Sequence, residues 1–267
     1  MSALAYTLGD SRTLLRRNLR RLRRYPSMTV MLIGLPIVFL LLFVYVFGGQ
    51  LSHGLSGGLA GGHVGRDGYL NYVTPGILLV TVAAAVQGTA IVVAMDMTGG
   101  IIDRFRTMSI GRAAVLGGHV LASMIQTLVS LAVVLGVAIA LGFRPTAGAL
   151  DWLGAIGLLA LFAGALIWLA TALGLAAKSV ETASNTPMFL TLLPFLGSGF
   201  VPTATMPGGL RQFATYQPFT PVTETLRGLL TGTHVGDNAI IALAWCVAIT
   251  AISYLWAIRL YTQREPR

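Results

Sequence analysis

Long apolar runs without a charged side chain recur along the chain and dominate its pattern. Uncharged runs of about 18 residues or more are candidates for membrane-spanning helices. Six such runs occur, and each has room for one helix. The first run is longer, but it combines a single apolar stretch with a glycine-rich tail. The predicted spans are about residues 28–48, 70–96, 113–142, 152–177, 183–201 and 238–258. The pattern therefore predicts an all-α polytopic membrane protein with six transmembrane helices, in a domain of residues 27–267.

A helical periodicity of a different kind precedes the first span. Five leucines fall on one narrow face of a helix, and arginines cover most of the next half-turn. The leucines are Leu4, Leu8, Leu15, Leu19 and Leu22. We interpret residues 1–26 as a basic amphipathic helix on the cytoplasmic interface of the membrane, where arginines attract anionic lipids. A further role as a surface for a partner protein is compatible with the same pattern.

The region before the last span, Phe195–Gly232, interrupts an apolar stretch with four prolines. They are Pro202, Pro207, Pro218 and Pro221. Broken helical backbone at membrane depth is tolerated only where protein or a water-filled cavity covers it. We therefore expect the fifth span to end near Phe200, and one or two short re-entrant or interfacial helices to follow before the sixth span.

Composition and charge fit this membrane assignment. The chain is 55% hydrophobic and 10% charged, whereas soluble domains contain about 25% charged residues. With a cytoplasmic N-terminus, fourteen of the eighteen Lys and Arg residues fall on the cytoplasmic side, as the positive-inside rule requires. Both termini are therefore predicted to be cytoplasmic. The net charge of +9 follows from topology, so it does not indicate nucleic-acid binding.

Sequence motifs for ATP hydrolysis and metal binding are missing from the chain. A nucleotide site needs the pattern GxxxxGK[ST], but the single lysine, Lys178, does not lie in one. The string Leu55–Gly58 matches the start of an ABC ATPase signature, yet it falls in a predicted external loop. Cys246 is the only cysteine, and His53 and His63 are too weak a pair to assign a metal site. The chain is therefore not expected to be an enzyme.

Ionisable groups are absent from the centres of the predicted spans. Because proton- and sodium-driven carriers place such groups within their spans, a secondary carrier is disfavoured. Ser198 lies in a GSG string without a base nearby in the predicted topology, so we interpret it as a small-residue helix contact, not a protease nucleophile. The polar residues in or near the spans either line a path or bond between helices: Gln87, Gln126, Ser130, Thr171 and Asn185.

Charge is concentrated in the loop Gly99–Val120, between the second and third spans. Its charged residues and a close neighbour are Asp96, Asp103, Arg104, Arg106 and Arg112. The topology puts this loop in the cytoplasm, where it forms either a docking surface or an ordinary loop that obeys the positive-inside rule.

Two long strings carry a family resemblance. Met95–Ser123 contains GIIDRFR, and Thr186–Gly232 contains FVPTATMP and QPFTPVTETLR. Both strings resemble ABC-2 type permeases of the daunorubicin-resistance type. The resemblance implies the membrane half of an ATP-driven exporter, with two permease copies and two copies of a separate ABC ATPase. It also implies that ATP and Mg²⁺ bind the partner ATPase, and that this chain binds no cofactor.

The resemblance also implies roles for individual residues. In this family the loop after the second span forms a coupling helix that sits in a groove of the ATPase. Carried onto this chain, the contact residues are Gly100, Asp103, Arg104, Phe105 and Arg106, with Phe105 as the apolar anchor. Ser109 stands where family members commonly have proline, which would change the angle at which the loop ends.

The predicted function is export of an amphipathic drug, secondary metabolite or lipid-like compound, which connects the chain with multidrug and antibiotic resistance. The candidate pathway residues are Met188, Phe189 and Phe195, for which ordinary helix packing is the alternative. One lysine against seventeen arginines suggests a GC-rich bacterial genome, hence a bacterial plasma membrane. The alternative functions are a membrane anchor or assembly subunit that transports nothing, and a secondary carrier.

Overall fold

All regular structure in the described part of the chain is helical. The computed structural model describes residues 26–48, 66–98 and 112–263. The long helices are α2 (Pro26–Leu41), extended by the π-helical turn η1 (Leu42–Val46), α4 (Arg66–Thr98), α6 (Arg112–Ala140), α7 (Ala149–Ala176) and α12 (Asn238–Gln263). The short ones are α8 (Val180–Asn185), α9 (Met188–Leu192), η2 (Leu193–Leu196), η3 (Thr203–Thr205), α10 (Gly208–Tyr216) and α11 (Phe219–Thr231).

Four helices in these ranges are long and apolar enough to cross a membrane. Their apolar segments are Gly68–Thr98, Leu116–Ala140, Ala149–Ala176 and Asn238–Thr262. The apolar part of the first predicted span, Val30–Val46, is shorter. The predicted class of all-α multi-pass membrane protein is confirmed, and four of the six predicted spans have a full-length counterpart.

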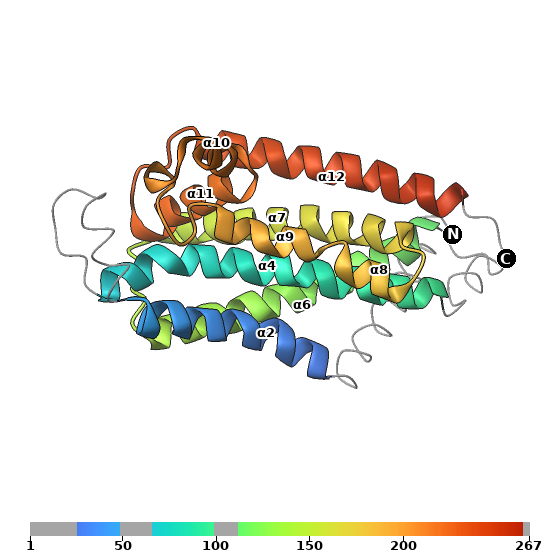
Figure 1. The fold of residues 1–267 in the computed structure, drawn as a ribbon, viewed down its shortest axis with the longest axis horizontal. Coiled ribbons are helices and arrows are strands. Elements are labelled where there is room, and N and C mark those ends of the chain that lie inside the picture. Colours follow the sequence, from blue (N-terminus) through green and yellow to red (C-terminus); the bar gives the residue numbers. More distant parts are fainter. Residues whose placement is uncertain (1–25, 49–65, 99–111, 264–267) are drawn as a thin grey trace.

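The fifth predicted span is not one continuous helix but three short helical segments, α8, α9 and η2. Pro187 follows α8, and Pro194 lies in the 3₁₀ turn of η2. Proline lacks the N–H that a helix needs and its ring clashes with the preceding turn, which explains the breaks. The three segments run back along α4 (Figure 1), so a neighbouring helix covers the interrupted backbone, as a membrane requires.

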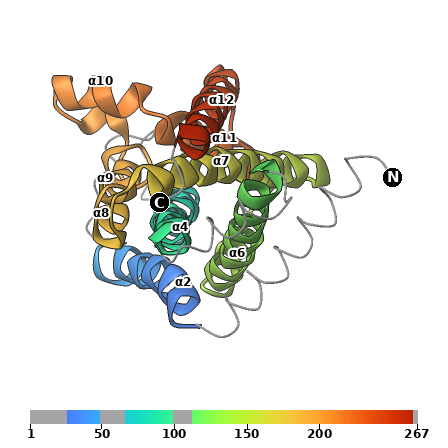
Figure 2. The ribbon, with the colours of Figure 1, turned by 90° about the vertical axis from the view of Figure 1, so that its right-hand side faces the viewer.

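Helix α4 occupies the centre of the bundle, and α2, α6, α7 and α8 pack around it (Figure 2). In its most apolar segment 72% of residues are buried, against 17% in α12, which packs mainly on the outer side of α7. Close approach of α7 to α4 depends on Gly174, where an added Cβ would lie 2.7 Å from the Ala90 carbonyl oxygen. α4 is therefore the central element of the bundle, while α12 joins it mainly through α7.

The two ends of the bundle differ in structure (Figure 1). At one end, which we call the loop end, α4 terminates at Thr98, α6 begins at Arg112, and α7 and α12 terminate. The other end, the α11 end, holds α10 and α11 and the first turns of α4, α7 and α12. The chain therefore reverses direction between successive long helices from α2 to α7.

Candidate functional site

The residues predicted to contact an ATPase lie outside the described ranges. They are Gly100, Asp103, Arg104, Phe105 and Arg106, and the same holds for residues 1–25 of the predicted interfacial helix. Both assignments stay predictions. The structure does describe the helices on either side of the loop, α4 and α6, and their packing against each other.

A buried carboxylate and imidazole join these two helices close to the loop. Nε2 of His119, on α6, lies 3.3 Å from Oδ2 of Asp96, on α4. His119 is 4% exposed and Asp96 is 2% exposed. Helix α6 begins at Arg112, so His119 lies within the bundle, at the cytoplasmic end of the predicted third span.

A second polar cluster lies at the α11 end and is centred on Arg227. Its Nη1 donates to Oε1 of Glu224 at 2.7 Å, and its Nη2 donates to the carbonyl oxygens of Ser198 at 2.8 Å and Tyr72 at 3.3 Å. The guanidinium carbon lies 3.8 Å from the centroid of the Tyr72 ring. The phenol of Tyr72 also donates to the Ser198 carbonyl oxygen, at 3.0 Å. One buried arginine thus connects α11, α4 and the turn after η2.

The topology prediction assigned Arg227 to a loop on the outer side of the membrane, and the structure places it, buried, on helix α11. Sequence reasoning missed the role because the three groups that it contacts come from separate elements. The available signal was the spacing of Glu224 and Arg227, which places an acid and a base on neighbouring positions of one helical face.

Residues 197–201 form a turn that packs tightly against α4. A Cβ added at Gly76 would lie only 2.6 Å from the carbonyl oxygen of Gly199, so no other residue fits there without movement of the backbone. The backbone N–H of Ser198 donates to Oγ1 of Thr220 at 3.3 Å. The interpretation of Ser198 as a small-residue packing contact agrees with this environment.

The three candidate pathway residues do not come together. Phe189 is 77% exposed and Met188 is 56% exposed on α9, so both point away from the bundle. Phe195, in η2, instead belongs to an aromatic cluster, with ring centroids 4.9 Å from Phe200 and 5.2 Å from Phe39. Phe43 completes the cluster at 4.4 Å from Phe200. Aromatic residues of the first predicted span therefore stabilise the broken fifth one.

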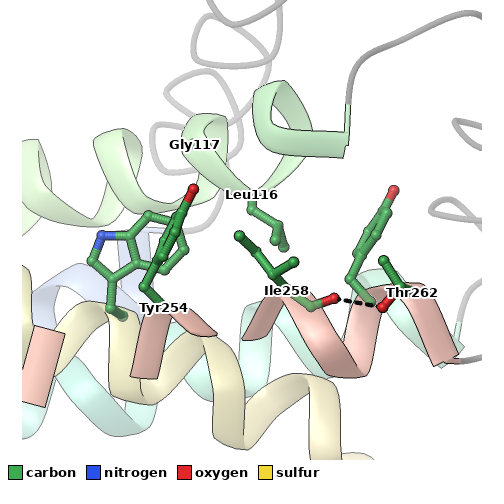
Figure 3. Close-up of a pocket in the computed structure, with 7 residues that line it drawn as sticks. Leu116, Gly117, Tyr254, Ile258 and Thr262 are labelled. Atoms are coloured by element: carbon green, nitrogen blue, oxygen red, sulfur yellow. Dashed lines mark hydrogen bonds between the residues drawn. The ribbon is translucent and has the colours of Figure 1, made fainter. Parts of the chain in front are cut away.

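A small apolar pocket opens between α6, α7 and α12 at the loop end (Figure 3). It has a volume of about 240 Å³ and is lined by Leu116, Gly117, Trp168, Tyr254, Ile258, Tyr261 and Thr262. The hydroxyl of Thr262 already donates to the backbone carbonyl oxygens of Ile258 and Arg259. Since pockets for drug-sized ligands measure about 300–1,000 Å³, we do not assign this one to a substrate.

Comparison with known proteins decides the family. Residues 10–231 match the profile of the ABC-2 type transporter family. The chain belongs to this family. It is 27% identical over 264 residues to a daunorubicin resistance ABC transporter permease protein of Streptomyces coeruleorubidus, covering 98% of this chain and 89% of that protein. It is also 27% identical over 255 residues to a probable doxorubicin resistance ABC transporter permease protein of Mycobacterium tuberculosis, covering 93% and 87%.

Membership of the ABC-2 type transporters confirms the family resemblance seen in the sequence. The match spans α2 to α11 and includes the first string that carried the resemblance and all but the last residue of the second. Within this ABC-2 chain, the Asp96–His119 pair and the Arg227 cluster are therefore features of a transporter membrane domain, one at each end of the bundle.

Proposed function

We propose that this chain is the membrane permease subunit of an ATP-driven exporter that works with a separate ABC ATPase. The observation that carries the proposal is the ABC-2 match over residues 10–231. Two further facts support it: the relatives are named as permease proteins, and the chain contains no GxxxxGK[ST] motif of its own. Energy for transport must then come from a partner.

The proposed topology has six passes and cytoplasmic termini. The passes are α2 with η1, α4, α6, α7, the broken segment α8–η2, and α12, while α10 and α11 form a re-entrant region before the last pass. The return of α8–η2 along α4 supports this count, and the placement of fourteen of eighteen Lys and Arg residues supports the orientation. The loop end is then cytoplasmic.

The proposed coupling mechanism is a rigid-body push at the loop end. Closure of two ATPase copies on ATP and Mg²⁺ displaces the loop that contains Asp103, Arg104, Phe105 and Arg106. Because α4 and α6 flank this loop directly, they receive the displacement first. α4 packs against most other helices of the bundle, so its movement reaches them too.

The proposed pathway lies between two copies of the permease, in the plasma membrane of a bacterium. Exposed apolar side chains on α9, η2 and α10 support a second copy on that side: Met188, Phe189, Leu192, Leu196, Leu210, Phe213 and Tyr216. Proteins named for daunorubicin and doxorubicin resistance support an amphipathic drug, secondary metabolite or lipid-like compound as substrate. Entry would be lateral or cytoplasmic, along α2, α4 and α8–η2.

The test reconstitutes the permease with its partner ABC ATPase in lipid vesicles and measures ATP hydrolysis and uptake of labelled doxorubicin. We expect ATP-dependent uptake, and at least about a tenfold loss of transport in Phe105→Ala, since buried aromatic anchors dominate interfaces. Asp151→Ala, at the opposite end, is the matched control. Uptake driven by an ion gradient without ATP would indicate a secondary carrier. Absence of transport across a panel of amphipathic compounds, despite stable assembly, would indicate an anchor subunit.

A further inference from the structure

The Asp96–His119 pair occupies an unusual place for a buried ionisable contact. Asp96 lies two residues before the end of α4 at Thr98, and His119 lies in the second turn of α6. Buried apolar side chains lie one helical turn before each partner, namely Val93 on α4 and Leu116 on α6, which are 1% and 2% exposed. The pair is therefore a buried polar contact between α4 and α6, close to the end of α4 and the start of α6.

Stability alone does not account for such a pair. Removing a carboxylate and an imidazole from water costs free energy, and well-packed apolar residues of similar volume often stabilise a protein equally or better. A directional bond differs from apolar packing in fixing the rotation and axial register of one helix relative to its neighbour. Both helices also contribute aliphatic side chains to the main apolar core, and such contacts are non-directional.

We propose that Asp96 and His119 are positioning residues for energy coupling, holding the last turn of α4 and the first turns of α6 in one register. A displacement of the loop then moves both helices together instead of separating them. This inference rests on the proposed function of the loop as the ATPase contact. It adds two residues that touch neither substrate nor nucleotide and that act through the helices they connect.

The experiment measures the number of substrate molecules transported per ATP hydrolysed by the complete permease–ATPase complex in vesicles. His119→Ala is expected to leave ATP hydrolysis within about twofold of wild type and to lower this ratio at least about fivefold, the lower end of typical coupling effects. The matched control is Asn71→Ala. Oδ1 of Asn71 accepts the Arg144 N–H at 3.2 Å, so this variant removes an inter-element bond at the other end of α4.

A cross-link separates a positioning role from a merely structural one. In a Cys246→Ala background, which removes the single native cysteine, Asp96→Cys and His119→Cys are combined and joined by a short bifunctional thiol reagent. The reagent is expected to restore at least half of the wild-type ratio in the double variant and to change neither single variant. If the pair served only to satisfy two buried groups, the double variant, which contains neither of them, would keep the wild-type ratio without the reagent.

The outcomes distinguish this inference from the function on which it rests. Wild-type complex without ATP-driven transport contradicts the proposed function. Wild-type transport combined with an unchanged ratio in His119→Ala overturns only the positioning role. A parallel loss of folded protein, hydrolysis and transport in His119→Ala, together with no restoration in the cross-linked double cysteine variant, also overturns it.

Discussion

The guanidinium of Arg227 lies against the ring face of Tyr72, 3.8 Å from its centroid, and donates to the carbonyl oxygen of the same residue. Tyr72 therefore contacts one buried cation through both its ring and its backbone carbonyl oxygen. A carboxylate, Glu224, balances the charge from the preceding turn of α11. Charge-assisted hydrogen bonds and a ring contact of this kind are strongest where water is excluded.

Arg227→Ala should destabilise the permease by about 3–5 kcal/mol, because it leaves Glu224 without its buried counter-charge and removes the guanidinium donor from the carbonyl oxygens of Tyr72 and Ser198. The midpoint of thermal unfolding in detergent measures the effect. Arg211→Ala, at an exposed position on α10, removes the same side chain and should change stability by less than about 0.5 kcal/mol. Equal midpoints for the two variants would contradict the structural role of Arg227.

Gly76→Ala should destabilise the protein by about 1–3 kcal/mol, since the new methyl group meets the backbone of Gly199, which has no side chain to rotate away. Gly88→Ala provides the control on the same helix. No atom lies within 4 Å of the Cβ built there, so alanine should be neutral or stabilise by about 0.5–1 kcal/mol through its better helix propensity. The midpoint of thermal unfolding of each variant shows whether the substitution destabilises or stabilises the protein.

The candidate pathway residues should separate into two groups when they are substituted. Phe195→Ala removes ring contacts with Phe39 and Phe200 and should cost about 1–3 kcal/mol of stability, less than the about 3–5 kcal/mol of a fully buried phenylalanine. Phe189→Ala should leave stability unchanged within about 0.5 kcal/mol because its side chain is exposed. If Phe189 lines the pathway, its variant changes the transport KM while unfolding stays the same; an unchanged KM would exclude it from the pathway.

Membrane orientation can be tested with single cysteines in the Cys246→Ala background. His234 and Lys178 are both exposed, at the α11 end and at the loop end respectively. A membrane-impermeant maleimide added to intact cells should label His234→Cys, and should label Lys178→Cys only after the membrane is permeabilised. The reverse pattern would overturn the proposed cytoplasmic location of the loop end.

The sequence predicted the long helices well because charge ends each apolar run. The starts and ends of α4, α6, α7 and α12 fall within about five residues of the predicted spans. It failed at the fifth span because Pro187 and Pro194 carry no charge and do not interrupt an apolar run. A single proline does not always break a helix: Pro36 lies inside α2 and Pro75 inside α4.

The polar clusters were harder to predict than the helices. The bond between Arg227 and Tyr72 joins residues 155 positions apart, and the partners are backbone oxygens, which every residue has. The Asp96–His119 contact was easier to predict from the sequence. Two antiparallel helices joined by one loop bring residues on either side of that loop together, so an acid and a histidine flanking it were candidates for pairing.

The breaks in α8–η2 have a mechanical consequence. A continuous helix bends only if backbone hydrogen bonds lengthen or rupture, and that resistance keeps most transmembrane helices stiff. At Pro187 and Pro194 the ring nitrogens have no hydrogen to donate, so these bonds are already missing from the ground state. The segment α8–η2 can therefore flex at two fixed points, and the aromatic cluster around Phe195 lies directly beside the second of them.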